Sequence, residues 1–197
     1  MEDNGGNVKK IIILFLLIMF NPFILKAEIK SEGLIESLKK ENIEIKCPNY
    51  EENDKQATIY LFKQYGESKT LNLLNYLNEI CEEYGQFFKI KSYEIYTNED
   101  NKELFTNTID YLQSRSSDVP FMVVGDSYFI TFNENNKETL LKTFLRLYQS
   151  EDKVDKVEEV LTKYYRNDAL IIGLFFGFII AFVGLIVIAK VYNKERK

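Results

Sequence analysis

Histidine and tryptophan are both absent from the 197 residues, and cysteine occurs only at Cys47 and Cys81. Without histidine, the chain lacks the side chain that most often serves as a general base near neutral pH and that most often binds metals. Two cysteines are too few for a zinc cluster or a network of disulfides. We therefore expect no bound metal and no cofactor.

Basic residues are scarce in the middle of the chain. Residues 28–168 contain 18 lysines and arginines against 27 acidic residues, a net charge of −9. A surface with this charge repels phosphate backbones, which makes nucleic acid an unsuitable partner.

Charge is missing altogether from one long run, Ala169–Ala189. As a helix rising about 1.5 Å per residue, 21 residues span about 30 Å, the thickness of the hydrocarbon core of a bilayer. Basic residues follow at once in 190–197, and such residues mark the cytoplasmic side. The sequence predicts a single transmembrane helix at 169–189, in contact with lipid, and a cytoplasmic tail at 190–197.

Residues 1–27 have the pattern of a signal peptide. Lys9 and Lys10 precede the short apolar run Ile11–Phe20, and the segment ends with Leu25-Lys26-Ala27. Because Leu25 and Lys26 make an imperfect cleavage site, the segment is either removed or retained as a second anchor. Both alternatives place residues 28–168 on the extracytoplasmic side of the cell membrane.

Hydrophobic periodicity predicts the elements of this exported region. The extension 28–56 contains a helix at 31–40, with Ser31 as its N-cap, and a short strand at 43–46. Strands are predicted at 57–62, 87–96, 119–124 and 127–132, with helices at about 68–84, 98–112 and 138–148; residues 150–168 are predicted to form a helical stalk. This order indicates an α/β fold with a mixed sheet flanked by helices.

The same order resembles the thioredoxin superfamily over residues 57–149. The resemblance depends on the strand Ala57–Phe62, the helix after it, the segment KIKSYEIYTNEDNKELF and the segment VPFMVVGDSYFITF. It implies a cis peptide bond between Val119 and Pro120, facing the loop that precedes the first helix.

The loop itself lacks the chemistry of the catalytic members of that superfamily. They carry Cys-x-x-Cys there, with the thiolate stabilised by the helix N-terminus. Here residues 63–70 read KQYGESKT, without sulfur. Dithiol exchange at this site is excluded, and we interpret Ser68 or Thr70 as a helix cap and Glu67 as a favourable charge at the helix N-terminus.

The two cysteines leave alternatives open. Cys81 lies on the apolar face of its predicted helix, as a buried core residue would. A disulfide between Cys47 and Cys81 is the other alternative in an oxidising exterior.

Three functions are consistent with this sequence. The first is a non-catalytic, membrane-anchored module that binds a peptide or partner protein by strand addition, in a chaperone-like or accessory role. Its predicted groove is formed by Tyr65, Gly66, Glu67 and Ser68, with Val119 and Pro120 opposite. The second is a thiol-disulfide redox protein that uses Cys47 and Cys81. The third is a structural accessory subunit of a membrane complex, with its contacts made by the stalk and the membrane helix.

Overall fold

The computed structural model describes residues 28–195, so the predicted signal segment 1–27 lies outside the described residues. In the last helix, side chains are not described at 164–172 and 187–195. The helices are α2 (Leu34–Lys40), α3 (Ser68–Tyr84), η1 (Gly85–Phe87, a 3-10 turn), α4 (Glu99–Tyr111), α5 (Glu134–Gln149) and α6 (Lys156–Glu195); the strands are β1 (Ala57–Lys63), β2 (Phe88–Glu94), β3 (Phe121–Val124) and β4 (Ser127–Ile130).

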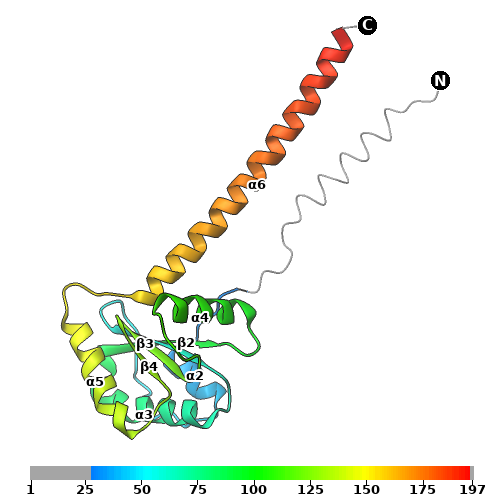
Figure 1. Ribbon diagram of the computed structural model, residues 1–197. Helices are drawn as coiled ribbons and strands as arrows, with labels where there is room; N and C mark the ends of the chain where they lie inside the picture. Colours follow the sequence, from blue (N-terminus) through cyan, green and yellow to red (C-terminus); the bar gives the residue numbers. More distant parts are fainter. Residues whose placement is uncertain (1–27, 196–197) are drawn as a thin grey trace.

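The four strands form one mixed sheet in the order β2-β1-β3-β4 (Figure 1). The crossover through α3 makes β1 and β2 parallel, with Ala57 opposite Phe88. Strand β3 runs antiparallel to β1 and pairs with β4 through a two-residue turn. Gly125 occupies this turn with φ +65°, a conformation that glycine adopts without a Cβ clash. The predicted α/β class and mixed sheet are thus confirmed.

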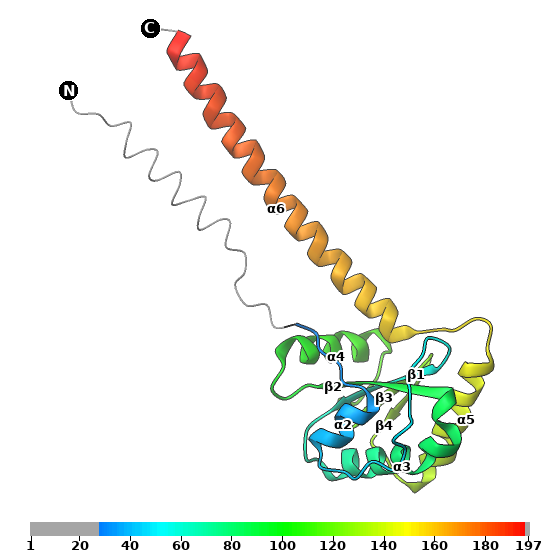
Figure 2. The same cartoon turned by 180° about the vertical axis from the view of Figure 1, so that it is seen from behind.

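Each face of the sheet packs against its own helices (Figures 1 and 2). The alternation of side chains along β1 separates Ile59 and Leu61 from Tyr60 and Phe62. The first pair packs in a core with α2, α3 and α5. The second pair packs in a smaller, aromatic core with α4 and the first turns of α6. A fully buried side chain of this kind contributes about 1.5–3 kcal/mol.

Two predictions for the N-terminal extension 28–56 were wrong. Residues 43–46 form no strand, because the side-chain amide of Asn78 takes the place of a pairing strand. Its Oδ1 accepts from the Lys46 amide at 2.9 Å, and its Nδ2 donates to the Glu44 carbonyl at 2.7 Å. Helix α2 is capped at Gly33 rather than at Ser31, and the Leu34 amide donates to the Glu52 carboxylate at 3.4 Å.

The last helix, α6, combines the residues predicted as stalk and as membrane span. Val157, Val160 and Leu161 are buried in the second core, so these turns belong to the α/β unit. Beyond them α6 extends away from the unit (Figure 1). Within the described part of the chain, none of the helices combines the length and apolar composition that a membrane crossing requires.

Candidate functional site

The loop between β1 and α3 is shaped by two of the residues that the sequence singled out. Gly66 has φ +70° and turns the chain toward α3. Glu67 caps the helix, because its carboxylate accepts from the Thr70 amide at 2.6 Å. The predicted caps Ser68 and Thr70 do not play this part. The loop is therefore fixed in place while Tyr65 and Ser68 stay exposed.

Val119 and Pro120 lie at the same end of the sheet. The pairing of Phe62 with Phe121 places Pro120 opposite Lys63, where β1 leads into the loop. The Val119–Pro120 bond is cis, as the resemblance implied. Pro120 is buried and its carbonyl accepts from the Thr131 amide at 2.8 Å. Val119 is partly buried, and its main chain forms no hydrogen bond with any described residue.

The structure adds a buried charge cluster that sequence reasoning missed. Lys63 ends β1 and its side chain is 0% exposed. Its Nζ lies 3.3 Å from Glu32 Oε2 and 3.5 Å from Glu41 Oε1, and both carboxylates are almost completely buried. The ammonium group forms no hydrogen bond with the described residues. A buried lysine beside two carboxylates is held by charge, so each partner depends on the others.

Tyr65 connects this cluster to the loop. Its hydroxyl donates to Glu32 Oε1, which also accepts from Lys40 Nζ at 2.7 Å. The Lys63 ammonium lies 4.3 Å from the centre of the Tyr65 ring, within the range of a cation–π interaction. Burial, followed by the hydrogen bond to the Glu32 carboxylate, raises the pKa of Tyr65 to about 12. Tyr65 is therefore a neutral hydrogen-bond donor at physiological pH.

The carboxyl group of Glu32 experiences opposing effects. Burial raises the pKa of Glu32. The hydrogen bonds from Lys40 and Tyr65 and the charge of Lys63 together lower it by more, so the pKa lies below the usual 4.5. A carboxyl group with a lowered pKa in the folded state stabilises the fold above its unfolded pKa. This stabilisation is lost as the pH falls through the folded pKa.

We expect Glu32→Gln to cost about 2–3 kcal/mol at pH 7, since it removes a hydrogen-bonded buried charge. The free-energy difference from the natural chain should shrink as the pH falls below 4.5, because protonation then removes the same charge from the natural protein. Urea unfolding of the full chain between pH 7 and pH 2.5 measures this. Glu79→Gln, at an exposed pair with Lys46, is the matched control and should be nearly neutral. A difference that stays constant with pH contradicts the assignment.

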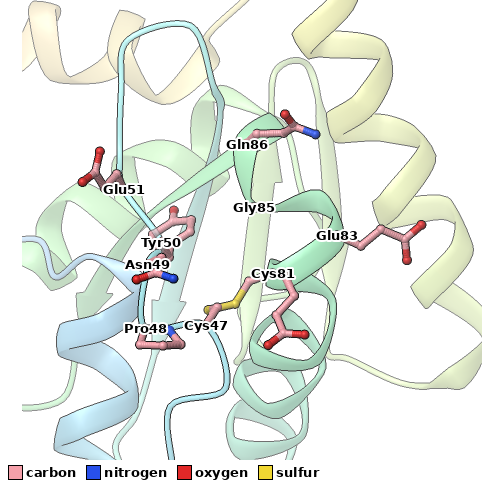
Figure 3. Close-up of a pocket in the computed structure, with 10 residues that line it drawn as sticks. Cys47, Pro48, Asn49, Tyr50, Glu51, Cys81, Glu83, Gly85 and Gln86 are labelled. Carbon is pink, nitrogen blue, oxygen red and sulfur yellow. A yellow bond between two sulfur atoms is a disulfide. The ribbon is translucent and has the colours of Figure 1, made fainter.

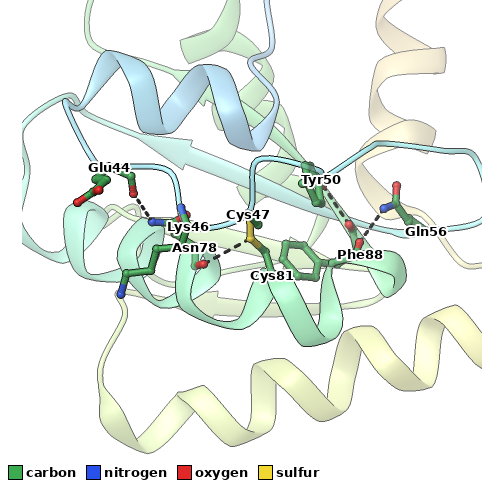
Figure 4. Close-up of a disulfide and its surroundings, with 9 residues drawn as sticks. Glu44, Lys46, Cys47, Tyr50, Gln56, Asn78, Cys81 and Phe88 are labelled. Atoms are coloured by element: carbon green, nitrogen blue, oxygen red, sulfur yellow. Dashed lines mark hydrogen bonds between the residues drawn. A yellow bond between two sulfur atoms is a disulfide. The ribbon is translucent and has the colours of Figure 1, made fainter.

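Cys47 and Cys81 form a disulfide with a Cα–Cα distance of 6.0 Å (Figure 4). It joins the extension to α3 near the C-terminal end of that helix, which ends at Tyr84. Cys81 Sγ lies 3.4 Å from the Asn78 carbonyl oxygen, an ordinary contact because a disulfide sulfur carries no hydrogen. The C-terminal end of a helix disfavours a thiolate, whereas reactive dithiols lie at N-terminal ends. This position favours a structural bond over the redox alternative.

The disulfide also lines a cavity of about 570 Å³, between the loop Cys47–Glu51 and the end of α3 (Figure 3). Its walls carry the exposed carboxylates Glu51, Glu82 and Glu83. Its lining residues 47–51 precede β1 and residues 85–86 precede β2, whereas Lys63 is the last residue of β1. It contains none of the predicted groove residues.

Within the described residues, no group of three or more histidine, cysteine or acidic side chains is placed to hold a metal ion. Comparison of the chain with models of protein families, with curated proteins and with solved structures found no match.

Proposed function

We propose that this chain is a membrane-anchored, extracytoplasmic, thioredoxin-like protein without redox activity, which binds an extended peptide of a partner protein. The proposed binding site lies at the end of the sheet, between the loop Tyr65–Ser68 and Val119–Pro120. The thioredoxin-like assignment is supported by the strand order β2-β1-β3-β4 and by the parallel pair joined through α3. It is further supported by the antiparallel hairpin that follows Pro120.

One observation carries the binding proposal. The N–H and C=O groups of Val119 have no hydrogen-bond partner among the described residues. Val119 lies two residues before Phe121, which pairs with Phe62 at the end of the sheet. Free main-chain groups beside an exposed loop can pair with an incoming extended peptide, which is how strand addition gains affinity. The absence of sulfur from the loop leaves binding, without electron transfer, as the chemistry of this site.

The membrane location is proposed from α6 and from the disulfide. Side chains of α6 between residues 173 and 186 are mostly exposed and apolar. Large apolar side chains on the surface of a helix that extends away from the α/β unit are favourable in lipid and unfavourable in water. The exposed large apolar side chains of α6 are Leu174, Phe175, Phe176, Phe178, Ile180, Phe182, Val183, Leu185 and Ile186. The Cys47–Cys81 bond is compatible with an oxidising compartment, which agrees with an extracytoplasmic α/β unit.

Strand addition at Val119 makes a specific prediction about peptide main chains. A displayed library of extended peptides is selected on the full-length protein in detergent. The selected peptide is then synthesised with one N-methyl group at each position in turn. Since the Val119 carbonyl can accept one peptide N–H, we expect methylation to weaken binding by tenfold or more at a single position, the peptide residue that donates to Val119, and much less at its neighbours.

A photoreactive residue at Gln64, which is exposed and directly follows β1 at the same end of the sheet, should crosslink to this peptide. The same probe at Gln86, which lines the cavity beside the disulfide, serves as the control position. Capture at Gln86 instead of Gln64, or a methyl scan without one strongly sensitive position, contradicts the proposed site.

A further inference from the structure

Two hydrogen-bond donors of the loop and the ammonium group that precedes it all face carboxylates of the N-terminal extension. The Gly66 amide donates to Glu41 Oε2 at 3.0 Å. The Tyr65 hydroxyl donates to Glu32, and Lys63 lies within ion-pair distance of both acids. The loop therefore presents positive charge and polar hydrogens to one chemical group, the carboxylate.

Glu41 has the geometry of a bound ligand. One oxygen accepts from the Gly66 amide, and the other lies 3.5 Å from Lys63 Nζ. The Glu41 side chain is 5% exposed, although its main chain lies in the turn that follows α2. Its Oε1 forms no hydrogen bond with any described residue, nor does Lys63 Nζ. Charge holds Lys63 and Glu41 together, and another carboxylate could bind the same ammonium group and the same Gly66 amide.

Glu32 differs from Glu41 in how firmly its main chain is held. Its amide and carbonyl both pair with Ser92 at 2.8 Å, on the outer edge of β2. Leu34 and Leu38 then anchor α2 in the core. Glu41 follows the last turn of this anchored helix, so its side chain can leave the site while the rest of the extension stays in place.

We propose that Lys63 and the Gly66 amide form a carboxylate-binding site, which Glu41 of the same chain occupies. The extension thereby competes with an acidic side chain of a partner for the loop. This inference rests on the proposed function, because it assigns acidic character to the peptide that binds beside Val119. It also explains why Glu32 and Glu41 of the extension bind the exposed loop Tyr65–Ser68.

Chemical rescue by acetate tests the site directly. Glu41→Ala removes the atoms that acetate contains, and leaves the Cβ. We expect acetate to shift the Gly66 amide resonance of the full-length variant, labelled with nitrogen-15 at its 9 glycines, in a saturable manner. The apparent affinity should be at least tenfold higher than in the natural chain, where Glu41 fills the site. Acetamide, which has the same shape without the charge, should cause no saturable shift.

Glu79→Ala is the matched control, because Glu79 is exposed and pairs with a lysine far from the loop. If Glu41→Ala fails to fold, Glu41→Asp keeps the charge but withdraws it from Gly66, and acetate should then give a weaker, still saturable shift. An absence of any shift in a folded variant, or an equal response to acetamide, overturns the carboxylate site. The methyl scan of a selected peptide is independent of this result, so strand addition and carboxylate binding can fail separately.

Discussion

Replacement of Lys63 by methionine is expected to lower the free energy of unfolding by about 3–5 kcal/mol, because it leaves the buried Glu41 carboxylate without a counter-charge and Glu32 with Lys40 alone. Methionine retains most of the aliphatic volume of lysine, so the loss reports charge rather than packing. Lys63 is fully buried and lies within 3.5 Å of Glu32 and Glu41. Denaturant unfolding of the full-length chain in detergent, followed by near-ultraviolet circular dichroism, measures the change.

Lys46→Met provides the matched control, since Lys46 is 55% exposed and pairs with the exposed Glu79 at 3.4 Å. Its effect should stay within about 0.5 kcal/mol. Adding Glu32→Gln and Glu41→Gln to Lys63→Met removes all three charges and should recover part of the lost stability. A loss below 1 kcal/mol for Lys63→Met, or no recovery in the triple variant, contradicts a charge-held cluster.

Removal of the disulfide is expected to cost about 4 kcal/mol. Cys47 and Cys81 are 34 residues apart, and loop-closure entropy in the unfolded chain gives this magnitude for a loop of that length. The variant Cys47→Ser with Cys81→Ser should unfold at a correspondingly lower denaturant concentration. The folded spectrum should persist, because Asn78 and the buried α2 hold the extension to α3 independently.

The reducing agent dithiothreitol gives the control for this prediction. It should destabilise the natural chain by nearly the same amount as the double substitution and should leave the serine variant unchanged. If the redox alternative were correct, mild oxidation and reduction would exchange this bond rapidly in the folded state. The position near the C-terminal end of α3 predicts slow exchange instead. Equal stability of the bonded and reduced chains contradicts a structural bond.

The main elements of the fold could be predicted from periodicity. The uncharged run Ala57–Phe62 predicted β1. The apolar face that carries Cys81 predicted α3, and the structure buries Leu74 and Leu77 on that face as well. Residues 43–46 have the alternating pattern of a strand, and a strand was therefore predicted there. Their main chain pairs instead with a side chain, that of Asn78. A side chain that replaces a strand leaves no periodic signal in the sequence.

The site was only partly predictable. The lack of sulfur in the loop and the position of Pro120 are visible in the sequence. The charge cluster is not, because Lys63 follows an apolar strand in the same way that a solvated lysine would. Its partners Glu32 and Glu41 come from a segment 22 or more residues earlier, and only the tertiary structure brings them together. The position of Lys63 as the direct continuation of a buried strand was the one feature of the sequence that could have indicated a buried charge.

The beginning of α6 has a consequence for orientation. Asp155 accepts from the Tyr60 hydroxyl at 2.7 Å and from the Glu158 amide at 2.9 Å, and the next turns are buried in the aromatic core. The first turns of α6 are thus fixed rigidly to the α/β unit. One residue inserted after Leu161 would rotate everything beyond it by about 100° about the helix axis. The direction in which the end of the sheet points around the axis of α6 is therefore set by the helical phase of α6.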